Sequence, residues 1–213
     1  MALKKIEKEV ALIWKEFSAL HDLSKEQEEK LKNYISLLFG ERGKANLTAI
    51  TTVEGVIYDH FVDSLMIKNF LTIDDIHAIC DVGTGAGFPV VPIKIAYPHL
   101  RTFLIEVNQK KIRFLEKVID TLGLEGIQIC DLDWRTFLRK TTHKIDLFCA
   151  RASLRPEELI RAFSPMCPYK NSTIVYWASI GWEPHKKIVP FIENEQEYTV
   201  KNKKRRFIFL RKP

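Results

Sequence analysis

Apolar residues in the first seventy positions recur at intervals of three and four, which places them on one face of a helix. This spacing predicts a helix over residues 2–20, with apolar positions Leu3, Ile6, Val10, Ile13, Trp14 and Phe17. Ser24-Lys25-Glu26-Gln27 is a capping box that opens a second helix, and Gly40 ends it. A third helical stretch is predicted over residues 57–71. Residues 1–72 are therefore expected to form a helical N-terminal cap.

From residue 76 the pattern changes to short, almost wholly apolar runs that alternate with helical stretches. The runs predict strands at 76–82, 102–106, 127–130, 145–150 and 173–178, and helices are predicted at 89–97, 110–122, 134–140 and from Pro156. This alternation is typical of a parallel sheet covered by helices on both faces. Residues 197–200 and 206–210, joined by a tight polar turn, predict a C-terminal antiparallel hairpin. Residues 73–213 are expected to form a second domain, in one compact unit with the cap.

Composition narrows the class of protein. The 213 residues are 46% hydrophobic and 28% charged, which excludes a disordered chain or a fibre. We expect a cytoplasmic protein, because no apolar run is long enough to span a membrane and no secretory leader is recognisable. The four cysteines are too widely spaced for a zinc ribbon or a redox pair, so buried reduced thiols are expected; they are Cys80, Cys130, Cys149 and Cys167.

A glycine-rich turn, Asp81-Val82-Gly83-Thr84-Gly85-Ala86-Gly87, follows the first predicted strand and precedes a helix. Glycines at such a position allow a tight turn and let a ligand approach the backbone closely. Glu106 ends the next strand, 23 residues beyond Gly83, where an acidic side chain accepts hydrogen bonds from ribose hydroxyls. The combination predicts a crevice that binds an adenosine group.

The spacing of the turn favours S-adenosylmethionine over a dinucleotide. The turn reads G-x-G-x-G rather than G-x-G-x-x-G, and Phe88-Pro89 stands where a pyrophosphate needs free N–H groups. Asp81, just before the glycines, suits a ligand that carries positive charge. S-adenosylmethionine has an ammonium and a sulfonium group and no phosphate.

These residues resemble the GidB/RsmG-type 16S ribosomal RNA methyltransferases, of which this chain looks like a divergent member. The resemblance lies in Asn46-Leu47-Thr48, in residues 60–65, in the turn from Asp81 to Pro92, and in Arg151-Ala152. It implies methyl transfer from S-adenosylmethionine to N7 of a guanine in small-subunit ribosomal RNA. It also implies a Rossmann-like class I methyltransferase fold in residues 73–213, with a seven-stranded, mostly parallel sheet and a C-terminal antiparallel hairpin.

The turn and the resemblance together assign the site residues. The residues expected to bind the cofactor are Asp81, Gly83, Gly85, Gly87, Phe88, Glu106, Trp134, Arg135 and Arg151, with Trp134 and Arg135 acting through their backbone. Arg151 and His60 are the catalytic candidates, in orienting roles. The N7 lone pair of guanine carries no proton, so no general base is expected, and no metal site is evident. Arg151 is expected to orient the cofactor carboxylate, a phosphate or guanine O6; the alternative is a surface arginine.

Four positions depart from the family pattern: Asp59, Val90, Asp133 and Ser179. Ser179 lies where the family has a Leu-Lys-Gly segment, and the missing lysine leaves the identity of the substrate undetermined. The alternatives are therefore a methyltransferase with another substrate, or a ribosome- or RNA-binding protein with a degenerate cofactor site. His60 and Asp63 lie three residues apart, and we expect either a structural hydrogen bond to the glycine turn or a substrate contact.

The basic excess lies at the end of the chain. The net charge is +6, and the last thirteen residues hold seven basic and no acidic side chains. If the sixth strand is parallel to the others, its turn into the last strand lies at the edge where such sheets bind ligands. The expected RNA-binding residues are Lys201, Lys203, Lys204, Arg205 and Arg206. A solvated turn that protects a sheet edge is the alternative. We expect ribosomal RNA or the small subunit as partner, and a monomer that does not bind membranes.

Overall fold

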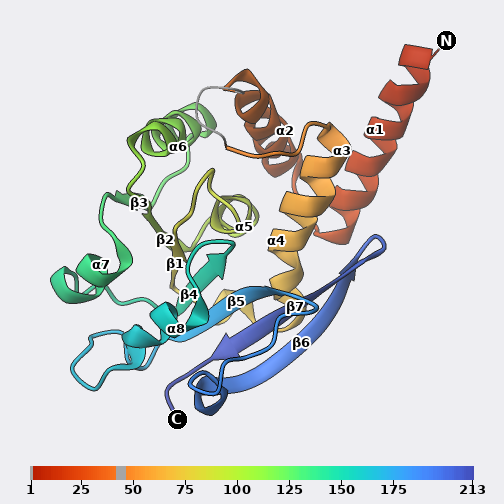
Figure 1. The fold of residues 1–213 in the computed structure, drawn as a ribbon. Coiled ribbons are helices and arrows are strands. Elements are labelled where there is room, and N and C mark those ends of the chain that lie inside the picture. Colours follow the sequence, from red (N-terminus) through yellow and green to blue (C-terminus); the bar gives the residue numbers. More distant parts are fainter. Residues whose placement is uncertain (1, 42–46) are drawn as a thin grey trace.

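The computed structural model describes residues 2–41 and 47–213, with side chains from residue 8 onward (Figure 1). A seven-stranded sheet runs through the molecule. Its order is β3 (Ile127–Cys130), β2 (Arg101–Ile105), β1 (Ala78–Val82), β4 (Leu147–Arg151), β5 (Thr173–Ser179), β7 (Lys203–Leu210) and β6 (Ile192–Val200). The first five are parallel, and β7 is antiparallel to both of its neighbours. The predicted mostly parallel sheet with a C-terminal hairpin is confirmed.

The strand order positions the site. β1 lies between β2 and β4, so the chain leaves β1 in one direction across the sheet and later returns on its other side. Ligands of such sheets bind at the carboxyl ends of the strands that flank this reversal. β6 is antiparallel to β7 and so runs in the same direction as β1 to β5. The β6–β7 turn therefore lies at this carboxyl edge, as the sequence predicts.

Helices cover both faces because the strand side chains alternate between two apolar cores. In β1, Ile79 belongs to the core under α2 (Lys25–Gly40), α5 (Val90–Ala96) and α6 (Gln109–Leu122). Its neighbour Cys80 belongs to the core under α7 (Trp134–Lys140), α8 (Pro156–Leu159) and the 3₁₀ turn Ile160–Phe163. The predicted two-sided covering is confirmed.

The N-terminal helices pack onto the first of these cores. α1 (Ala2–Leu20) contributes Trp14 and Phe17, and the ring of Trp14 lies 6.4 Å from that of Phe61. Tyr34 stacks between Phe61, at 5.9 Å, and Phe88 of the glycine turn, at 5.3 Å. One apolar core therefore joins the helical cap to the sheet, and the division at residues 72 and 73 stays a prediction.

Several local predictions hold. The side chain of Ser24 accepts a hydrogen bond from the Gln27 N–H at 3.2 Å, and Gln27 accepts one from the Ser24 N–H at 2.8 Å, which confirms the capping box. All four cysteines are free, and Cys80, Cys130 and Cys149 are buried while Cys167 is half-buried. Among the described residues, no helix is long and apolar enough to cross a membrane.

The third helix differs most from its prediction. It begins earlier, as α3 (Val53–Val56), and continues as a π-helix over Ile57–Val62, then α4 (Asp63–Leu65) and the 3₁₀ turn Met66–Asn69. Thr52 caps its start by accepting a hydrogen bond from the Gly55 N–H at 3.1 Å. A further 3₁₀ turn, Ile73–Asp75, leads into β1 and another, Val189–Phe191, into β6. The hairpin strands are also longer than predicted, because half of β6 is exposed and polar.

Candidate active site

The glycine turn between β1 and α5 requires glycine for two different reasons. Gly83, Gly85 and Gly87 have φ values of 68°, 62° and 100°, a region that other residues rarely adopt. A Cβ on Gly87 would lie 2.5 Å from the Tyr34 hydroxyl oxygen, and one on Gly83 would lie 2.8 Å from Cβ of Ser153. A Cβ on Gly85 would meet no atom within 4 Å. Gly85 therefore borders open space, as a ligand-binding glycine should.

Glu106 faces this open side of the turn. It follows directly after β2 and is only 8% exposed. One carboxylate oxygen accepts the Gly85 N–H at 3.0 Å, and the other accepts the N–H groups of Val107 and Asn108 at 3.0 and 2.9 Å. A carboxylate has about four acceptor positions, so one is left for a ribose hydroxyl. The residue fits the role predicted for it.

Asp81 is buried beneath the turn. Its Oδ2 accepts hydrogen bonds from the Thr84 hydroxyl at 2.7 Å and the Val90 N–H at 3.4 Å. Its Oδ1 has no partner among the described residues. Burial raises the pKa of Asp81 to about 7, because a charged carboxylate is poorly solvated there. The unpartnered oxygen suits a cationic ligand such as the ammonium of S-adenosylmethionine.

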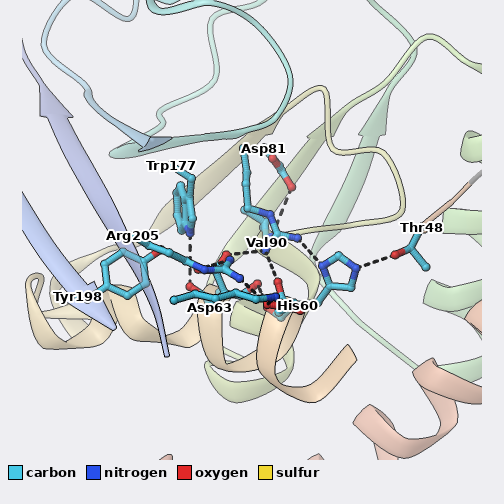
Figure 2. A network of polar contacts seen from close by, with 12 residues as sticks. Thr48, His60, Asp63, Asp81, Val90, Trp177, Tyr198 and Arg205 are labelled. Carbon is cyan, nitrogen blue, oxygen red and sulfur yellow. Dashed lines mark hydrogen bonds and ion pairs between the residues drawn. The ribbon is translucent and has the colours of Figure 1, made fainter. Parts of the chain in front are cut away.

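Arg151 ends β4 and binds Asp63 and His60, which Figure 2 labels within a network of polar contacts. Its guanidinium donates to Oδ2 of Asp63 at 2.8 Å and to Nδ1 of His60 at 2.9 Å. It also lies over the ring of Phe88, 5.4 Å from the ring centroid. The side chain is 14% exposed, so the alternative of a surface arginine does not describe it.

His60 links the helical cap to the glycine turn. Its ring stacks on Phe88, with the centroids 4.1 Å apart and the planes 9° from parallel. Burial, and then the charge of Arg151, lower the pKa of His60 to about 3, so the ring is neutral. Because Arg151 donates to Nδ1, the proton sits on Nε2, which donates to the Thr48 hydroxyl at 2.9 Å. The role is structural, but the hydrogen bonds go to Arg151 and Thr48 rather than to the glycine turn as predicted, and the contact beside the turn is ring stacking on Phe88.

Asp63 was expected to make a structural hydrogen bond or a substrate contact, but its charged partners were not predicted. Its side chain is fully buried, and besides Arg151 it binds the Tyr198 hydroxyl at 2.7 Å and Arg205 at 2.9 Å. The Trp177 indole donates to its backbone carbonyl at 3.3 Å, so Trp177 is a core residue (Figure 2). An acid in a run of apolar residues was a signal, because a buried charge needs charged partners. Those partners lie far away in the chain.

The basic residues of the hairpin face acidic residues of the third helix. Lys203 and Arg205 both bind Asp59, at 2.9 and 2.5 Å, and Lys201 binds Glu54. Asp59 departs from the family pattern, and its two basic partners account for an acid at this position. Arg206 is directed elsewhere, to Glu195 at 3.0 Å and the Trp182 carbonyl. Only Lys204 has no ion pair in the part of the chain that the structure describes.

The remaining predicted residues lie around the same edge. Trp134 and Arg135 begin α7 at the carboxyl end of β3, which leaves their backbone N–H groups free of helical partners. The Trp134 ring is buried and donates to the Glu158 carbonyl at 2.9 Å. Asp133 departs from the family pattern, and its role as the N-cap of α7 explains an acid there. Ser179, which also departs from the pattern, is exposed at the end of β5. Asn46 lies outside the described residues.

The chain matches the family described as rRNA small subunit methyltransferase G over residues 27–211. This protein therefore belongs to the rRNA small subunit methyltransferase G family. Ribosomal RNA small subunit methyltransferase G of Halalkalibacterium halodurans is 36% identical over 154 residues, which are 71% of this chain and 65% of that protein. The protein of the same name from Aster yellows witches'-broom phytoplasma is 41% identical over 52% of this chain and 54% of its own length. The matched part thus spans less than two thirds of these relatives.

Solved structures share the fold. MtNAS, crystallised in complex with MTA and tNA, superposes with a TM-score of 0.58 at 14% identity, covering 94% of this chain and 82% of its own. The human methyltransferase 10 domain containing protein gives a TM-score of 0.58 at 12% identity, covering 84% and 96%. The predicted family and the Rossmann-like fold are confirmed.

Proposed function

We propose that this protein transfers a methyl group from S-adenosylmethionine to N7 of a guanine in small-subunit ribosomal RNA. The observation that supports it most is the position of Arg151. At the carboxyl end of β4 it is held by Asp63 and His60, packs over Phe88 and borders the glycine turn that carries the cofactor fingerprint. Bound S-adenosylmethionine supplies an electrophilic methyl group on a sulfonium.

Residues at the ends of three neighbouring strands would hold the cofactor. Gly85 has open space beside it, Glu106 would accept a ribose hydroxyl, and the unpartnered Oδ1 of Asp81 would favour positive charge. The backbone N–H groups of Trp134 and Arg135, at the start of α7, would contact the adenine. Phe88 supplies the apolar wall against which His60 and Arg151 are packed.

The reaction needs alignment rather than proton removal. The guanine N7 lone pair is free, so the attacking atom requires no base, and both ring nitrogens of His60 are occupied by hydrogen bonds. Holding the reactants in line contributes up to about 7–11 kcal/mol of barrier reduction. Since positive charge moves onto the purine, Arg151 does not stabilise the product. It orients the cofactor carboxylate, an RNA phosphate or guanine O6.

The hairpin turn provides the RNA side of the site. Lys201, Lys203 and Lys204 are exposed at the carboxyl edge, where Lys201 pairs with the exposed Glu54 and Lys203 with the half-buried Asp59. Such pairs contribute only about 0–1 kcal/mol, so RNA phosphates can replace the acids. Arg205 and Arg206 are half-buried and hold the hairpin in place. With ribosomal RNA as substrate, a monomer acting in the cytoplasm is the simplest arrangement.

Methylation assays separate this function from its alternatives. Purified protein with S-adenosylmethionine should form 7-methylguanosine in small-subunit RNA that comes from a strain lacking this gene, as read by nucleoside mass spectrometry. Cofactor binding in a calorimeter without any 7-methylguanosine would favour another substrate. Absence of cofactor binding would favour an RNA-binding protein with a degenerate site.

A further inference from the structure

A groove between α7 and the segment 161–168 is lined by arginines and contains no acidic lining residue. It has a volume of about 750 Å³, and its lining residues are Arg135, Leu138, Arg139, Arg161, Ser164, Met166, Cys167 and Pro168. Figure 1 places α7 on the opposite side of the molecule from the β6–β7 turn. The groove is therefore separate from the basic hairpin.

The positive charge of the groove is only partly compensated. Glu158 is the single acid paired with Arg135 and Arg161, at 2.9 and 2.8 Å. Arg139 donates only to the backbone carbonyl of Arg135, at 3.3 Å, and has no ion pair in the described chain. At the hairpin, by contrast, Lys201, Lys203 and Arg205 all face acids. The groove therefore keeps net positive charge, whereas ion pairs neutralise most of the positive charge of the hairpin.

The lining of the groove is partly apolar. Met166 is 92% exposed, and Leu138, Pro168 and the half-buried Cys167 also line the groove. Guanidinium groups beside apolar side chains suit a chain of phosphates whose sugars and bases need a non-polar surface. Arg135 lies in the first turn of α7, at the carboxyl edge, so an RNA strand in the groove leads toward the predicted cofactor site.

We propose that this groove, lined by Arg139 and Arg161, is a second RNA-docking surface that holds the phosphate backbone flanking the target nucleotide. The proposal rests on the proposed function for the identity of the RNA. The charge complementarity between the groove and phosphates rests on the structure alone. The substrate then contacts the enzyme on both sides of the site, at the hairpin turn and at α7.

The test is the affinity of an Arg139→Ala/Arg161→Ala variant for a small-subunit ribosomal RNA transcript. The matched control is Lys8→Ala/Lys15→Ala, which removes two positive charges from exposed positions of α1. We expect the groove variant to bind RNA at least tenfold more weakly, with a salt slope reduced by roughly 1 to 2. The control should bind as the wild type does, and both should bind S-adenosylmethionine unchanged.

Cys167 gives a second readout, because it is the single half-buried thiol among four described cysteines. RNA should protect it from alkylation in the wild type and not in the groove variant. Equal RNA affinity of groove variant and control, or weaker binding only to assembled subunits and not to naked RNA, would overturn the proposal. These binding assays need no methyl transfer, so a negative result would contradict the RNA-docking surface without contradicting the proposed methyl transfer.

Discussion

Arg151 and Asp63, 88 residues apart in sequence, are joined by a 2.8 Å ion pair in which the carboxylate is fully buried. This pair ties the last residue of β4 to the start of α4. Asp63 also binds Arg205 and Tyr198, so one acid connects the active-site arginine, the helical cap and the hairpin. The orientation of Arg151 therefore depends on Asp63.

Asp63→Asn should damage both stability and activity. Removing one partner from a buried ion pair leaves uncompensated charge and costs about 3–5 kcal/mol. Because Arg151 is then misplaced, methyl transfer by the folded fraction should fall roughly 100-fold. Denaturant unfolding and methylation kinetics measure the two effects. Glu54→Gln, which removes an exposed pair with Lys201, should cost no more than about 1 kcal/mol; equal losses in both variants would refute the role of Asp63.

Two glycine substitutions should separate folding from cofactor binding. Gly87→Ala puts a Cβ against Tyr34 and Val91, so it should lower the free energy of unfolding by more than 2 kcal/mol, roughly the cost of overpacking plus backbone strain. Gly85→Ala has space for its Cβ and should cost only about 1 kcal/mol. It should nevertheless weaken S-adenosylmethionine binding, because the methyl group enters the ligand space. Unchanged cofactor affinity in Gly85→Ala would place the cofactor elsewhere.

Asp81 should make stability depend on pH. Burial raises its pKa to about 7, whereas the unfolded carboxyl titrates near 4. The folded chain thus holds a proton that the unfolded chain loses. The contribution of this proton to the free energy of unfolding is complete below pH 4 and disappears as pH rises through 7. The free energy of unfolding falls by on the order of 4 kcal/mol over this range. His60, with its pKa lowered to about 3, acts oppositely and loses its contribution as pH falls below 6.5.

The comparison with Asp81→Asn isolates this effect, because His60 is common to both proteins. The stability difference between wild type and variant should shift in favour of the variant between pH 5 and pH 8, as measured by urea unfolding. A difference that stays constant over this range would show that Asp81 ionises normally.

Asp59→Asn should tighten RNA binding. The change removes the acid that neutralises Lys203 and Arg205, so it frees positive charge at the hairpin turn. We expect a several-fold gain in RNA affinity and a steeper salt dependence. The fold should change little, because Asp63 still holds Arg205. Filter binding at two or more salt concentrations measures both quantities, and unchanged or weaker binding would mean that the hairpin does not contact RNA.

The sequence predicted what depends on local pattern. The strands of the parallel sheet, the capping box at Ser24 and the glycine turn at Gly83 all follow from short-range spacing or from local hydrogen bonds. The place of Glu106 beside Gly85 followed from the parallel register of β1 and β2, since both strands end at one edge of the sheet.

Contacts between distant residues were not predictable in this way. Asp59 and Arg205 are 146 positions apart, and nothing near either residue indicates that they meet. Counting charges along the chain therefore overstated the free positive charge of the hairpin. The π-helix Ile57–Val62 also has no recognisable local signal in the sequence.

The most direct test of the account is the 7-methylguanosine content of small-subunit RNA incubated with S-adenosylmethionine and either the wild-type protein or Arg151→Ala. The RNA comes from a strain that lacks this gene. We expect one added 7-methylguanosine with the wild type and a loss of roughly 100-fold in rate with Arg151→Ala, while cofactor still binds. A wild-type protein that adds none, or an Arg151→Ala variant as fast as the wild type, would contradict it.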